Sequence, residues 1–203
     1  RQMARKKVIV KRLSSIEDFG SMNILCADKT GTLTSGQIQL ESALNIAGQK
    51  SEKVSLFAFL NAHFQTSYIN PIDQAILASA KPDISQWSKL DAIPYSFERK
   101  RISLLLKNGS DSWIITKGAF EEVIKICTKA ETAEGQEVEI QTLSETLQKL
   151  YEESSNKGFR TIGLAYRKDA QISSIKPQDE QQMIFLGVLL FADAPKEHIA
   201  EDI

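Results

Sequence analysis

A carboxylate followed by a turn rich in glycine and threonine is the feature best suited to chemistry. Residues 28–34 read Asp-Lys-Thr-Gly-Thr-Leu-Thr and follow an apolar run at 24–27 that predicts a buried strand. Such a carboxylate can attack phosphorus and carry the phosphoryl group as an acylphosphate. The turn offers backbone N–H groups and hydroxyls to phosphate oxygens, and glycine lets the main chain approach them. A shorter match would more often be an ordinary polar loop, but all seven residues in this order favour phosphoryl transfer at Asp28.

These residues resemble the phosphorylation signature of the P-type ATPases, cation pumps that pass through an aspartyl-phosphate. The resemblance implies that Asp28 is the nucleophile and that Lys29 and Thr32 hold the transferred phosphate. It also implies that Asp28 and the backbone carbonyl of Thr30 ligate Mg²⁺. Related hydrolases of the same fold place a second Asp, a general acid/base, where this chain has Thr30. An acylphosphate without a nearby base should persist, as a pump requires.

Further residues resemble the nucleotide-binding positions of the same family. Phe97 would stack on adenine, a contact worth about 1–3 kcal/mol, and Arg99 would face the phosphates. From the residues alone, Phe97 is equally well interpreted as a core side chain beside a solvated basic run. Many family members place a lysine five residues after the aromatic residue, where this chain has Ile102. Lys100 and Arg101 are then the candidates for that role.

The resemblance extends to three more segments. Lys117 would close over the nucleotide, and Gly118 would let the backbone approach it. Asp73 would meet the adenine amino group, although an Asp in the first turn of a helix is also favoured by capping and by the helix dipole. Arg160 would reach the phosphates, and its alternative is an exposed arginine on a strand.

The elements that must position these residues follow from periodicity and from helix and turn signals. Strands are predicted at 8–11, 23–27, 159–166 and from 183; helices at 52–63, 70–80, from 119 and at 144–157; loops at 130–137 and 168–182. A hairpin is predicted from 101–107 and 112–116, with a four-residue loop. Ser144 is expected to cap its helix and Gly158 to end it.

With the family resemblance, this order implies an α/β fold class. A partial Rossmann-like (HAD-type) phosphorylation domain would contain an inserted α+β nucleotide-binding domain built on a mainly antiparallel sheet. Residues 1–39 would open the phosphorylation domain, and 40–180 would form the nucleotide-binding domain. Residues 181–203 would be the return strand and hinge, where Ala194 replaces the first of two prolines usual in the family.

Composition excludes several other classes of function. The 203 residues are 42% hydrophobic, which allows a real core, and the net charge of −1 argues against a nucleic-acid partner. Cys26 and Cys127 lie far apart with no CxxC pattern and are expected to be reduced core residues. The longest apolar stretch, at 183–192, is far shorter than the roughly 20 residues of a spanning helix.

Segments at 19–22, 61–66 and 93–99 look most like bacterial magnesium-transporting P-type ATPases. The resemblance implies ATP and Mg²⁺ as ligands, and the remaining phosphorylation, actuator and transmembrane domains of the same polypeptide as partners. The basic start fits a segment after a membrane helix, at the cytoplasmic face of the plasma membrane.

Two alternatives stay open: a P-type pump for another cation such as calcium, and a non-catalytic nucleotide-binding module. The second has weight because the family's later Mg²⁺-ligating segments do not occur in this sequence, so the chain by itself is expected to be inactive. A serine enzyme of the penicillin-binding type is disfavoured. Both SxxK matches follow the Lys-Thr-Gly at 29–31 that they should precede, and no SDN occurs.

Overall fold

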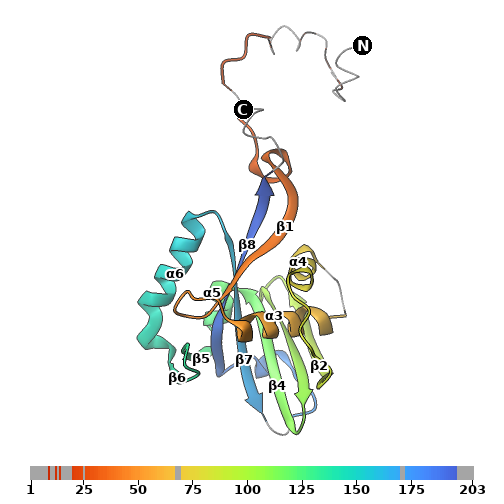
Figure 1. Ribbon diagram of the computed structural model, residues 1–203, viewed down its shortest axis with the longest axis vertical. Coiled ribbons are helices and arrows are strands. Elements are labelled where there is room, and N and C mark those ends of the chain that lie inside the picture. Colours follow the sequence, from red (N-terminus) through yellow and green to blue (C-terminus); the bar gives the residue numbers. More distant parts are fainter. Residues whose placement is uncertain are drawn as a thin grey trace.

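A computed structural model describes residues 9, 12, 14, 20–24, 26–66, 70–169 and 172–195. The described part of the chain forms one eight-stranded sheet with helices packed on it. Two long strands of this sheet, β1 and β8, continue beyond the other strands (Figure 1). The chain is α/β with a mostly antiparallel sheet, as predicted. No helix among the described residues is long and apolar enough to cross a membrane.

The sheet has the order β2-β3-β4-β7-β8-β5-β6, and β1 also pairs with β8. The strands are β1 (Thr34–Leu44), β2 (Trp87–Ser96), β3 (Arg101–Asn108), β4 (Asp111–Ala119), β5 (Cys127–Glu131), β6 (Glu137–Glu139), β7 (Arg160–Asp169) and β8 (Met183–Pro195). Only the β5–β8 pair is parallel among the described strands. Since β7 occupies one edge of β8, β5 and β1 must follow one another along its other edge.

The helices are α3 (Glu52–Phe64), α4 (Pro71–Ser79), α5 (Phe120–Ile124) and α6 (Ser144–Asn156), with short turns η1 (Lys29–Leu33), η2 (Ile140–Leu143) and η3 (Pro177–Asp179). Capping residues explain where α3 and α4, the two helices beside β1, begin. The Ser51 side chain accepts a hydrogen bond from the Val54 N–H at the start of α3. Asn70 caps α4 in the same way, and Pro71 occupies the first helical position, where its missing N–H costs nothing.

Each face of the sheet carries its own apolar core, because successive strand residues point to opposite faces. On one face, α3 and α4 cover Leu104, Ile115 and Leu164. On the other face, α5 and α6 pack with Leu105 and Ile114. Strands buried on both sides therefore have the continuous apolar sequences that identified β3, β4 and β8.

Most predicted helices and strands are present, with shifted ends. The helices at 52–63, 70–80 and 144–157 are confirmed as α3, α4 and α6, the helix near 119 as α5, and the strands at 159–166 and from 183 as β7 and β8. The hairpin is also confirmed, but its loop is shorter than the four residues expected. Asn108 pairs with Asp111, which leaves Gly109 and Ser110, and Gly109 has the positive φ of 60° that tight hairpin turns require.

The buried strand predicted at 23–27 is wrong for the residues described there. Ile24 is 74% exposed, Cys26 is exposed instead of lying in the core, and neither belongs to a strand. A strand is stable when its backbone groups pair, and no described residue pairs with this segment. Cys127 is buried as expected. The strand predicted at 8–11 lies outside the described residues, apart from Ile9.

Smaller errors concern polar segments. Ala130 and Glu131 belong to β5, and Glu137 begins β6, so the predicted loop at 130–137 is in fact the middle of a hairpin. Ser144 is the first residue of α6 and not its cap, because its hydroxyl donates backward to the carbonyl of Gln141. The sequence also gave no indication of β1 and β2.

Candidate nucleotide-binding site

Strand register brings most of the predicted nucleotide-binding residues to one end of the sheet. Arg101 pairs with Gly118, and Gly118 pairs with Gly163, so the β2–β3 turn and the end of β4 lie side by side with the start of β7. Phe97 lies in that turn, and Arg160 is the first residue of β7. The site is therefore formed by three adjacent strands, which explains how residues far apart in sequence come together.

Phe97 is on the surface and not in the core, which removes the structural alternative for this residue. Its exposed fraction is 88%, and its ring contacts that of the half-exposed Tyr95 edge to face, at 5.5 Å between centroids. The turn is held by the Lys100 N–H, which donates to the Ser96 carbonyl at 2.7 Å. An aromatic face is thus presented to solvent on an ordered turn, as base stacking requires.

Lys117 and Asp73 form a buried ion pair between β4 and α4. Their side chains are 5% and 1% exposed. Asn70 donates a hydrogen bond to the Asp73 carboxylate at 2.9 Å and accepts one from the Asp73 N–H, so Asp73 also takes part in the helix cap. Burial lowers the pKa of Lys117, and attraction to Asp73 opposes that shift. The paired carboxylate cancels the lysine charge, which suits contact with a neutral base better than contact with phosphate.

Gly118 is required by the packing of the strands themselves. A Cβ at this position would lie 2.4 Å from the Cβ of Arg101 and 2.5 Å from the Lys100 carbonyl oxygen. The Ala119 N–H donates to that same carbonyl at 2.9 Å, which locks the turn against β4. The close approach predicted here is therefore between β4 and the Phe97 turn, and contact with a nucleotide stays a prediction.

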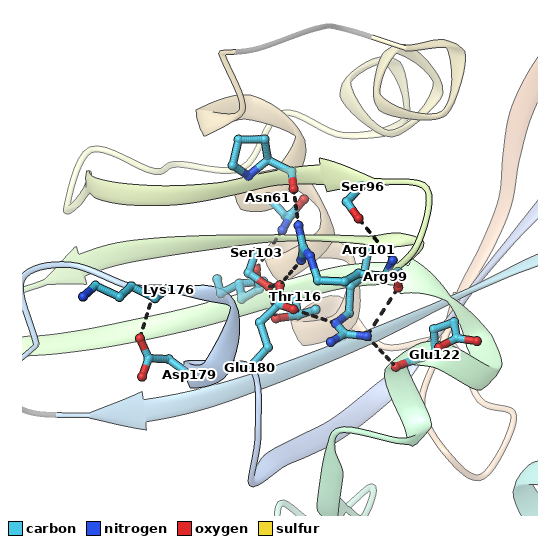
Figure 2. A network of polar contacts seen from close by, with 12 residues as sticks. Asn61, Ser96, Arg99, Arg101, Ser103, Thr116, Glu122, Lys176, Asp179 and Glu180 are labelled. Atoms are coloured by element: carbon cyan, nitrogen blue, oxygen red, sulfur yellow. Dashed lines mark hydrogen bonds and ion pairs between the residues drawn. The ribbon is translucent and has the colours of Figure 1, made fainter.

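Arg99 and Arg101 both bind Glu180, a residue that the sequence placed in a polar loop (Figure 2). The Arg99 Nη1 lies 2.7 Å from one carboxylate oxygen, and the Arg101 Nε lies 2.8 Å from the other. The second guanidinium nitrogen of Arg99 donates to the Pro94 carbonyl at 2.5 Å. Arg99 was predicted to face phosphates, but in this structure its fork is occupied by protein acceptors.

Other cations at this end of the sheet are more accessible. Lys100 and Arg160 are both exposed. Ile102, which stands where many family members have lysine, is 4% exposed and belongs to the buried run of β3. Lys100 and Arg160 are therefore the cations whose side chains solvent, or a polyphosphate, can reach.

The predicted phosphorylation turn lies beyond the sheet, at the end of the β1–β8 pair (Figure 1). Asp28 and Thr32 are exposed, and η1 begins at Lys29 and includes Thr30. The Thr34 hydroxyl donates to the Asp193 carboxylate at 2.7 Å and accepts from the Gly31 N–H, so the turn is connected to both strands. In the part of the chain that the structure describes, no cluster of three or more His, Cys, Asp or Glu residues could hold a metal.

Comparison with known proteins identifies the class of protein. The family model for the P-type ATPase cytoplasmic domain N matches residues 15–198. "Magnesium-transporting ATPase, P-type 1" of Escherichia coli (strain K12) is 35% identical over 207 residues, which cover 98% of this chain and 23% of that protein. The protein of the same name from Salmonella typhimurium (strain LT2) is 37% identical over 96% of this chain and 23% of its own length. The "Plasma membrane ATPase" of Kluyveromyces lactis is 27% identical over 99% of the chain and 21% of its length.

The chain belongs to the P-type ATPase family and comprises its cytoplasmic N domain. It spans about a quarter of the length of the curated relatives it matches. The resemblance inferred from the phosphorylation signature is thus confirmed at the level of the family, whereas the roles of individual site residues stay predictions.

Proposed function

We propose that this chain is the ATP-binding part of a magnesium-transporting P-type ATPase that forms an aspartyl-phosphate at Asp28. The observation that carries the nucleotide site is the meeting of an exposed Phe97, the buried Lys117–Asp73 pair and the exposed Arg160 at one end of the sheet. The higher identity to magnesium-transporting relatives, 35–37% against 27% for the plasma membrane ATPase, supports magnesium as the transported ion.

In this proposal, adenine stacks on Phe97, and Asp73 accepts a hydrogen bond from the adenine amino group. Lys117 closes over the base, and Gly118 allows the Phe97 turn to lie close to β4 and so to the base. The phosphates then extend toward Arg160, which lies on the side from which β8 continues to the Asp28 turn, because Arg160 pairs with Phe191 and β8 ends at 195. The nucleotide is thus oriented with its reactive end toward the nucleophile.

Phosphoryl transfer would use the exposed turn at the end of β1. Asp28 attacks the γ-phosphorus in line, while Lys29 and Thr32 hold the transferred group. The Asp28 carboxylate and the Thr30 carbonyl are oxygen donors of the kind Mg²⁺ prefers, although two donors are fewer than an octahedral ion requires. Bound Mg²⁺ would neutralise charge on the phosphates.

The domain arrangement belongs to the same proposal. Residues 1–39 and 181–203 are assigned to a HAD-type phosphorylation domain, and 40–180 to the inserted nucleotide-binding domain. The intact protein would place them at the cytoplasmic face of the plasma membrane, joined to actuator and transmembrane domains of the same polypeptide.

Nucleotide titration followed by NMR tests the binding site. A stacked ring with one or two charged contacts predicts a Kd of about 0.1–1 mM for ATP, with ADP similar. Phe97→Ala and Lys117→Ala should each weaken binding, whereas Leu90→Ala, which removes another partly exposed apolar side chain from β2, should not. Unchanged affinity in both site variants would contradict the assigned pocket.

Acid-quenched labelling of the intact ATPase tests the nucleophile. Acylphosphates survive acid and are cleaved by hydroxylamine, unlike serine and threonine phosphates. Asp28→Asn should abolish the hydroxylamine-sensitive label, and Glu41→Gln, which alters an exposed carboxylate on β1, should retain it. A sensitive label that survives Asp28→Asn would place the nucleophile elsewhere.

A further inference from the structure

Glu180 is a buried carboxylate whose partners lie on β3 and on the β2–β3 turn that carries Phe97. Its side chain is 0% exposed. It accepts hydrogen bonds from Arg99, Arg101 and the Ser103 hydroxyl, at 2.7, 2.8 and 2.7 Å. The Ser103 hydroxyl in turn lies 2.6 Å from that of Thr116 on β4. One carboxylate therefore connects the Phe97 turn, β3 and β4.

The segment that carries Glu180 is itself fixed to the sheet. The Ile175 N–H donates to the Asp91 carboxylate at 2.9 Å, which attaches the segment to β2. The guanidinium of Arg167 on β7 donates to the carbonyls of Asp179 and Gln181, at 2.8 and 2.6 Å. Glu180 is thus held on both sides along the chain, so it provides a rigid anchor for its partners.

This anchor lies on the opposite face of the sheet from the Lys117–Asp73 pair. Thr116 and Lys117 are consecutive residues of a strand and so point to opposite faces. Thr116 joins the Glu180 network (Figure 2). Lys117, by contrast, forms its ion pair with Asp73 on α4. Arg99 is therefore drawn away from the face that carries Lys117. Two guanidinium groups bound to one carboxylate leave a single net positive charge, shared among groups that are at most 19% exposed.

We propose that Glu180 is a positioning residue of the nucleotide site: it holds Arg99 and Arg101 and thereby fixes the turn that presents Phe97. This inference rests on the proposed function, since it assumes that Phe97 binds the base. Arg99 contributes through the shape of the turn and makes no contact with phosphate. A Glu at 180 then matters to adenosine as much as to ATP, although it touches neither ligand.

The test compares adenosine, ADP and ATP affinities of the 203-residue chain by NMR titration. Glu180→Gln keeps the shape of the side chain and removes its charge. It should weaken all three ligands by a similar factor of about five- to tenfold, in the range of couplings within one ion-pair network. The ring and amide resonances of Phe97 should shift in the absence of ligand.

Glu131→Gln is a matched control. Glu131 is also a nearly buried carboxylate, and it binds Lys53 at 2.6 Å and the Tyr166 hydroxyl, away from the Phe97 turn. This variant should lower stability without changing nucleotide affinity. Equal losses of affinity in Glu131→Gln and Glu180→Gln would reduce the effect to general destabilisation and overturn the proposal.

Arg99→Gln gives a second test that holds even if Glu180→Gln does not fold, because this variant leaves the Arg101–Glu180 pair intact. A positioning role predicts that adenosine and ATP weaken together. Loss of ATP affinity alone, with adenosine unchanged, would show that Arg99 contacts phosphate and would overturn the inference. If the unmodified chain binds no adenine nucleotide, the proposed function itself fails. That result differs from a failure of the Glu180 inference, in which the unmodified chain still binds nucleotide.

Discussion

Replacing Gly118 by alanine should disturb both the stability of the sheet and the nucleotide site. The added Cβ would lie 2.4 Å from the Arg101 Cβ and 2.5 Å from the Lys100 carbonyl oxygen. Nonbonded carbon atoms prefer separations of about 3.5–4.0 Å, so β3 and the Phe97 turn must move by about 1 Å. Overpacking of this kind costs about 1–3 kcal/mol, and we expect about 2–3 kcal/mol because the obstacle is backbone.

Thermal and urea unfolding of Gly118→Ala measure this cost. For a domain of this size, 2–3 kcal/mol corresponds to a fall in Tm of about 4–12 °C. Gly163→Ala is the control, since Gly163 pairs directly with Gly118 but its added Cβ would meet Val123 at 3.1 Å, a milder contact. ATP affinity should fall in Gly118→Ala and less in Gly163→Ala. Equal stability of Gly118→Ala and the unmodified chain would refute the packing argument.

Further expectations concern charge. Lys117→Met should lower the free energy of unfolding in urea by about 3–5 kcal/mol, because it leaves Asp73 buried without its ion-pair partner. Adding Asp73→Leu should restore part of that stability but no ATP affinity. A double variant less stable than Lys117→Met would contradict this reasoning. Hydrogen bonds from the Ile175 and Ala92 N–H groups lower the pKa of Asp91 below its ordinary value of 3.8. The ionised carboxylate therefore stabilises the folded state above pH 3.8, and this stabilisation is lost as the pH falls through the lowered pKa. Asp91→Asn should therefore destabilise the chain at pH 7 and cease to do so in strong acid, as measured by unfolding across pH. Mg²⁺ should change the ATP affinity of this chain less than tenfold against a chelator control, because Asp28 by itself is a poor ligand set for an octahedral ion.

The sequence predicted the features that depend on neighbours along the chain. Asn70 and Pro71 mark the start of α4, and the apolar runs of β3 and β4 flank a short turn, so local signals were sufficient there. The strand expected at 23–27 failed because apolarity alone does not provide a pairing partner. The first strand, β1, escaped prediction because its opening residues are polar and mostly exposed, and its pairing with β8 joins distant segments.

The candidate site shows the same division. Phe97, Lys117 and Asp73 were proposed through resemblance to a family. Strand register places the Phe97 turn beside β4, and the ion pair with Lys117 brings in Asp73 from α4. Glu180 was missed because it is 81 residues from Arg99, and no local pattern connects an acid in a polar segment to a distant basic run. The available signal was the basic run itself at 99–101, since three adjacent cations at a strand end favour a nearby counter-charge.

The β1–β8 pair has a mechanical consequence. Two antiparallel strands joined by hydrogen bonds form a ribbon, and β1 and β8 form one between Thr34 and Leu44. Its register shifts between Thr34 and Ile38, beside Gly36 with a φ of +71°, and such irregularities are where ribbons bend and twist. This irregularity therefore sets the direction in which the ribbon carries the Asp28 turn away from the sheet.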